Sequence, residues 1–232
     1  METSNNILTD LKAVLLENHR NFSFLNLYKG VPLVCRARLD RVEGSAAYYT
    51  VQPPESVALK AEQTTLVLSD GLLEPLEAKV ECVDLATGEY CLKEFTYAGS
   101  KFANRRELRV EPAGRLKVDI VSDGRSAAGE IADISVRGLG VNVPQQEQST
   151  LFIQGLTVGI TLHLPRNEVR LEGKIRNVSR KPESARLAIE FTGTVPEKAI
   201  IIRYVMQRRS EIVSEVRTLY EQEIRLKEPP EE

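Results

Sequence analysis

Two arginines and a short acidic turn are the parts of this sequence whose residue types and spacing best suit chemistry. Arg105 and Arg109 stand four positions apart, and a D-x-S-x-x-G pattern follows at Asp133, Ser135 and Gly138. A guanidinium is a planar fork that pairs with phosphate oxygens or with the O6/N7 edge of guanine, and its plane can stack on a base. Asp133 could hold such a fork or accept the N–H donors of guanine, Ser135 adds a hydroxyl, and Gly138 allows close backbone approach. The combination suits a compact guanine nucleotide.

The sequence offers little support for catalysis. It contains none of the patterns HExxH, GxSxG, GxxxxGK[ST] or GxGxxG, which weakens hydrolase, kinase and dehydrogenase interpretations. Its two histidines, His19 and His163, stand far apart, and Ser135 has no histidine near it in sequence to serve as a base. We therefore expect a protein that is not an enzyme, with no catalytic residues, no cofactor and no metal.

The charge balance argues against a protein that coats nucleic acid. The 232 residues hold 31 Lys and Arg against 33 Asp and Glu, and aromatic residues make up only 6% with no Trp. Bulk positive charge and aromatic stacking platforms are therefore both scarce. We expect no nucleic-acid partner, although a small nucleic-acid-binding β-barrel stays a weaker alternative because a local basic site is compatible with this total.

Cysteine usage and the N-terminus both indicate a cytoplasmic protein. The three cysteines form no CxxC pair, which suits a reducing compartment in which they act as small core residues: Cys35, Cys82 and Cys91. Charged residues at Asp10, Lys12 and Glu17 interrupt the N-terminal apolar residues. We therefore expect this segment to be neither a signal peptide nor a membrane span.

Charge also divides the chain into two parts. Residues 1–98 hold 9 basic and 14 acidic side chains, net −5, whereas residues 99–232 hold 22 and 19, net +3. A Gly-Ser pair at the join supports a hinge near residues 98–103. We predict an N-terminal β-rich split-barrel domain over 1–98, a second barrel domain over 99–195, and a C-terminal helix with a frayed tail over 196–232.

Short alternating runs predict a mainly β protein with two small antiparallel barrels. After a helix over about residues 5–18, five or so strands without intervening helices occupy residues 31–95. Six further runs form the second barrel: 115–121, 126–134, 138–143, 157–164, 169–178 and 185–191.

A long helical pattern closes the sequence. Pro196 and Glu197 suit a helix N-terminus, and the pattern continues to about Lys227. A helix of about 30 residues spans about 45 Å, longer than the face of a small barrel. Two interpretations stay open: the first half covers the barrel while the rest is solvated, or the helix pairs with a second copy or another partner.

The two motifs together resemble those of the PilZ family, bacterial receptors of the second messenger cyclic di-GMP. The family signature is RxxxR in a loop that leads into a six-stranded barrel, then [D/N]xSxxG between early barrel strands. The matching positions here lie within the resembling region, roughly residues 99–195: Arg105, Arg109, Asp133, Ser135 and Gly138. An acidic β-rich domain before this region is similar to the arrangement in flagellar-brake proteins. This likeness rests on the order of the domains and on their β-rich character, without a sequence motif.

The resemblance implies a non-catalytic receptor whose ligand is cyclic di-GMP. Binding would order the loop at the join, change the arrangement of the two domains and relay it to a protein partner, a flagellar motor component by family likeness, with motility or biofilm as the regulated process. Arg106 is an additional candidate phosphate contact. Some family members carry an Arg before RxxxR and hold two stacked messengers; Asn104 stands there in this chain, which leaves the stoichiometry open. The alternative is a PilZ-like interaction module that no longer binds nucleotide.

Overall fold

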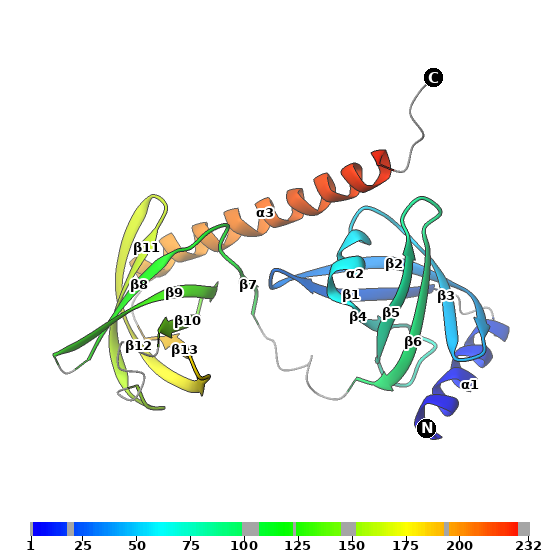
Figure 1. Cartoon of the computed structure of the whole chain (residues 1–232), viewed down its shortest axis with the longest axis horizontal. Helices are drawn as coiled ribbons and strands as arrows, with labels where there is room; N and C mark the ends of the chain where they lie inside the picture. Colours follow the sequence, from blue (N-terminus) through cyan, green and yellow to red (C-terminus); the bar gives the residue numbers. More distant parts are fainter. Residues whose placement is uncertain are drawn as a thin grey trace. The chain divides into compact units, whose positions relative to one another are not determined.

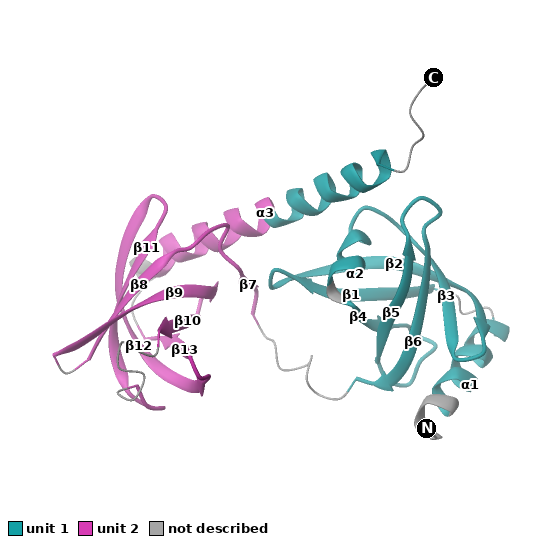
Figure 2. Cartoon of the chain, viewed as in Figure 1, with its two compact units in different colours: residues 1–106, 212–232 teal, residues 107–211 magenta. Residues whose placement is uncertain are grey.

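The strands and helices of this chain form two compact units in a computed structural model. The structure describes residues 2–17, 21–98, 107–122, 124–144, 152–192 and 195–226. One unit contains residues 1–106 and 212–232, and the other contains residues 107–211 (Figure 2). The predicted hinge at 98–103 lies almost entirely outside the described residues, and the predicted boundaries at 98 and 195 stay a prediction.

The first unit contains a closed antiparallel barrel in the strand order β1-β2-β3-β6-β5-β4 (Figure 1). Its strands are β1 (Asn21–Tyr28), β2 (Val31–Glu43), β3 (Ala46–Val51), β4 (Thr64–Leu68), β5 (Leu76–Asp84) and β6 (Glu89–Tyr97). Alternate residues of β2 are buried, which is the pattern of a strand with one face on a core. Phe22 and Phe24 both meet the fully buried Tyr49 edge-to-face.

Two elements of this unit were not predicted. Strand β1 completes the barrel as its sixth strand, although its own alternation at Phe22 and Phe24 signals it. Helix α2 (Val57–Glu62) interrupts a region that we expected to hold only strands. Six residues give no two-turn apolar stripe, so periodicity could not reveal α2. The N-terminal helix is confirmed as α1 (Glu2–Leu16), with Ile7, Leu11 and Val14 buried.

The second unit contains the predicted six-stranded antiparallel barrel. Strand order β10-β13-β12-β11-β8-β9 is closed by pairing between β9 and β10, and the two-residue β7 extends one side of β9. The strands are β7 (Arg109–Val110), β8 (Lys117–Ser122), β9 (Arg125–Ser135), β10 (Gly138–Pro144), β11 (Thr157–Leu164), β12 (Asn167–Arg180) and β13 (Ser184–Phe191). The mainly β fold with two barrels and terminal helices is thus confirmed.

The C-terminal helix is confirmed as α3 (Val195–Arg225). Its buried apolar residues recur at Ile201, Val205, Ile212 and Val216, at spacings that place them on one stripe. Beyond Glu211 the helix belongs to the first unit, where Lys29 and Lys60 each form an ion pair with it at 2.6 Å. The later half is therefore not simply solvated.

The three cysteines of the first unit differ in burial. Cys35 and Cys91 are buried as expected, but Cys82 is exposed, which corrects its assignment to the core. Strand β5 turns from burial to exposure after Ala78, so alternation alone misplaced this thiol.

Within the described residues, none of the helices combines the length and the apolar character needed to cross a bilayer.

Candidate functional site

Strand β7 brings the end of the first motif to the second motif. Arg109 is paired with Ser135, and Val110 is paired with Ile134, in an antiparallel ladder between β7 and β9. Val110 and Ile134 are both fully buried, so apolar packing fixes this short pairing. The backbone around Arg109 is thereby held beside the Asp133–Gly138 turn.

The carboxylate of Asp133 is the centre of the site. Its Oδ1 accepts a hydrogen bond from Nη1 of Arg109 at 3.2 Å, and its Oδ2 accepts one from Nη2 of Arg186. The side chain of Asp133 is 15% exposed, whereas those of Arg109 and Arg186 are 52% and 49% exposed. Two half-exposed guanidinium groups therefore share one largely covered acid, and the local charge is positive.

Gly140 makes room for this arrangement. A Cβ at position 140 would lie 2.6 Å from Oδ2 of Asp133 and 3.1 Å from Nη2 of Arg186. Strand β13 supplies Arg186 two positions before Ala188, which is the register partner of Gly140. Sequence reasoning missed both Gly140 and Arg186. The available signals were the second glycine after the motif and the outward place of Arg186 in an alternating strand.

Ser135 and Gly138 hold the turn together. The hydroxyl of Ser135 donates to the carbonyl of Gly138 at 3.1 Å and accepts from the backbone N–H groups of Arg137 and Gly138 at 3.3 and 3.1 Å. The residue is only 3% exposed. A Cβ at position 138 would lie 2.3 Å from the carbonyl oxygen of Ile189. Gly138 is thus required where β10 approaches the backbone of β13.

Additional ion pairs fasten the flanking segments. Glu107, which lies inside the RxxxR motif, contacts Nε of Arg137 at 2.5 Å. The buried Arg208 of α3 donates from Nε to the carbonyl of Glu111 at 2.9 Å, and its Nη1 contacts Glu211 at 3.2 Å. Helix α3 therefore anchors the segment that follows β7.

The structure brings four of the sequence-predicted residues together, namely Arg109, Asp133, Ser135 and Gly138. Asn104, Arg105 and Arg106 lie outside the described residues. Within the part of the chain that the structure describes, no group of three acidic, histidine or cysteine side chains could hold a metal ion. The arrangement can offer an anion two fixed guanidinium groups on one face of the barrel.

Comparison with known proteins identifies the second unit. Residues 103–207 match the model of the PilZ domain family, so the chain contains a PilZ domain. All the site residues described above lie within this range. No curated protein matches the sequence.

Three solved structures are similar to the chain at low identity. The K. pneumonia MrkH–c-di-GMP complex has 12% identity and a TM-score of 0.49, covering 93% of this chain and 98% of that one. The Escherichia coli YcgR–c-di-GMP complex has 12% identity and a TM-score of 0.44, covering 93% of both chains. The Bacillus subtilis inhibitor of motility MotI/DgrA has 12% identity and a TM-score of 0.42, covering 83% of this chain and 97% of that one.

Proposed function

We propose that this PilZ-domain protein is a non-catalytic receptor of cyclic di-GMP. The observation that carries the proposal is the convergence of Arg109 and Arg186 on Asp133, at the end of an RxxxR motif and within the matched PilZ domain. In this proposal Arg105 and Arg109 bind phosphate or guanine, Asp133 orients the guanidinium groups, and Ser135 and Gly138 shape the turn. Asn104 and Arg106 complete the candidate site.

Binding would follow from charge and from the donors that remain on the arginines. A guanidinium has five N–H donors, and the contact between Arg109 and Asp133 involves one nitrogen at 3.2 Å. Cyclic di-GMP carries two phosphate charges, and each charge-assisted hydrogen bond to it would contribute about 1.5–3 kcal/mol. Asp133 already holds the guanidinium groups of Arg109 and Arg186 in place. These side chains therefore lose less conformational entropy when the ligand binds.

Calorimetric titration with cyclic di-GMP tests the proposal and gives the stoichiometry. We expect saturable binding to the full chain and a loss of at least tenfold in affinity for Arg109→Ala, which corresponds to about 1.4 kcal/mol. Arg170→Ala is the matched control, because Arg170 is paired with Glu168 at the β11–β12 hairpin rather than with Asp133. Absence of binding by the unmodified chain, or an equal loss in both variants, would reject the site.

We further propose that binding changes the arrangement of the two units and is relayed to a protein partner in the cytoplasm. Supporting this, Arg105 lies in residues 99–106, which join the two barrels in the sequence. A flagellar motor component is the partner suggested by family likeness, and α3 is a candidate surface for a homodimer because Ile202 and Met206 are 41% and 50% exposed. Small-angle scattering at saturating ligand should change, whereas identical profiles with demonstrated binding would reject the rearrangement.

One observation favours a second candidate, an interaction module that does not bind nucleotide. The carboxylate of Asp133 and the hydroxyl of Ser135 already have partners inside the protein. These motif residues therefore have a structural role that does not depend on a ligand. The same titration separates the two functions, because the interaction module predicts no heat of binding at any ligand concentration.

A further inference from the structure

A row of four side chains crosses one face of the sheet that forms the first barrel. Strand pairing places Cys82 of β5 opposite Cys91 of β6, Cys91 opposite Tyr48 of β3, and Tyr48 opposite Arg41 of β2. Directly opposed residues in an antiparallel sheet project from the same face. The four residues therefore form a continuous row, and two adjacent members of it are thiols.

The pairing of Cys82 with Cys91 is of a kind whose usual spacing suits a disulfide. Opposed residues of antiparallel strands have Cα atoms roughly 4.5–5.5 Å apart, within the roughly 4.4–6.8 Å range of disulfides. A register shift between Val80 and Cys82 places an additional residue of β5 opposite β6 at this point. Burial, and after it the neighbouring thiol of Cys82, raises the pKa of Cys91.

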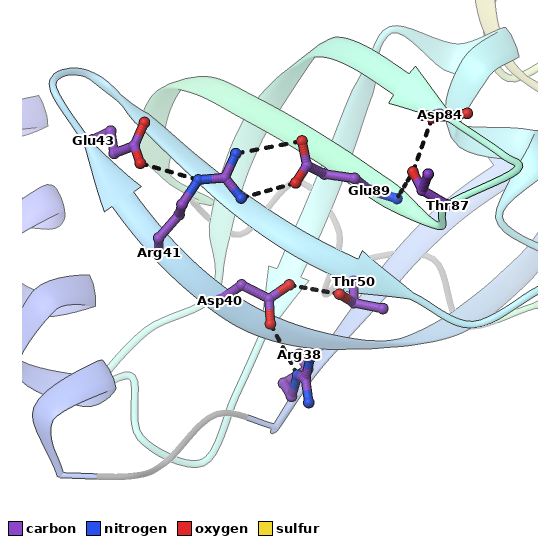
Figure 3. Close-up of polar contacts among 8 residues, drawn as sticks. All are labelled: Arg38, Asp40, Arg41, Glu43, Thr50, Asp84, Thr87 and Glu89. Carbon is purple, nitrogen blue, oxygen red and sulfur yellow. Dashed lines mark hydrogen bonds and ion pairs between the residues drawn. The ribbon is translucent and has the colours of Figure 1, made fainter.

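Exposure and surroundings give the two thiols different roles. Cys82 is exposed, whereas Cys91 is buried, so only Cys82 is open to a reagent in solution. Tyr48 and Lys93 partly oppose the rise in the pKa of Cys91. Arg41 lies over the ring of Tyr48, 3.8 Å from its centroid. Glu43 and Glu89 form ion pairs with this guanidinium (Figure 3). The row is therefore fixed at its far end.

We propose that Cys82 and Cys91 form a reversible redox site that a peroxide converts into a cross-strand disulfide. The Cys82 thiolate attacks one oxygen of hydrogen peroxide, the O–O bond breaks, and the departing hydroxide takes a proton as water, which leaves a sulfenic acid. The Cys91 sulfur then attacks the Cys82 sulfur, the S–O bond breaks, and the second oxygen leaves as water. Two thiols are oxidised as one peroxide is reduced.

Cys35 provides an internal control. It is buried in the same barrel, and burial together with Glu55 raises the pKa of its thiol to about 12. Thiolate is the reactive form, so this thiol should stay reduced while the pair reacts. The chain thus contains one inert and two paired cysteines.

Mass spectrometry of the full chain tests the proposal without any nucleotide ligand. Trypsin leaves Cys82 and Cys91 in one peptide, residues 80–93, and Cys35 in another, residues 30–36. After treatment with hydrogen peroxide and alkylation, we expect peptide 80–93 to lack both alkyl groups and to be lighter by two hydrogen atoms than its reduced form. Dithiothreitol should restore both alkylation sites, and peptide 30–36 should be alkylated throughout.

Variants assign the order of the two steps. In Cys91→Ser we expect a sulfenic acid at Cys82 that dimedone traps, and in Cys82→Ser we expect Cys91 to stay a thiol. Cys35→Ser should behave like the unmodified chain. The proposal is overturned if the unmodified chain accumulates sulfinic acid at Cys82 with Cys91 still alkylated, if two chains become linked through Cys82, or if neither thiol reacts.

Discussion

The turn glycine Gly138 offers a sharp test of how the candidate site is supported. In Gly138→Ala the new Cβ would lie 2.3 Å from the carbonyl oxygen of Ile189, and the next nearest atoms also belong to the backbone of β13. Atoms of this kind do not approach within about 3.0 Å, so β10 and β13 must separate by at least 0.7 Å (3.0 − 2.3) at this point. Overpacking against a backbone that cannot rotate away costs about 1–3 kcal/mol.

Equilibrium unfolding in urea measures this cost. With a slope of about 1–3 kcal/mol per molar urea, the midpoint of Gly138→Ala should fall by roughly 0.3–3 M. Gly114→Ala is the matched control, because nothing lies within 4 Å of the added Cβ and its midpoint should be unchanged or slightly raised. Equal midpoints for the two variants would show that β10 and β13 do not approach as closely as the structure indicates.

Three other perturbations separate binding, charge and anchoring. In Gly140→Ala the new methyl group meets the end of the Asp133 side chain rather than backbone. The affinity for cyclic di-GMP measured by calorimetry should therefore fall by about tenfold, while the urea midpoint stays nearly unchanged. The guanidinium of Arg41 lowers the pKa of Glu89, so the pair stabilises the fold above the unfolded pKa of this carboxyl and loses that contribution as pH falls through the folded value. In Arg41→Ala, NMR titration should find the Glu89 pKa raised towards its ordinary value. Arg208→Met removes the buried guanidinium that donates to the carbonyl of Glu111 and should lower the free energy of unfolding by about 0.5–1.5 kcal/mol. An unchanged value would contradict the anchoring role of α3.

The sequence by itself determined five of the six strands of the first barrel, the six strands of the second barrel and the motif residues. Alternation along a strand is local, because one face of each strand must be buried whatever its partners are. The six strands of the second barrel and the long helix could therefore be predicted from periodicity. Arg109 and Asp133 could be recognised because the spacing of a motif can be read from the sequence without knowledge of the fold.

Only the tertiary structure decided which side chains meet across the strands. Arg186 reaches Asp133 because β13 pairs with β10, and Cys82 meets Cys91 because a register shift in β5 sets their alignment. Register and barrel closure depend on packing between strands that are distant in sequence. A register shift of one residue moves every side chain of a strand to the opposite face of the sheet. Because register depends on these distant contacts, the sequence pattern could not reveal that Arg186 is the second arginine bound to Asp133. For the same reason it could not reveal the role of Gly140 or the pairing of the two thiols.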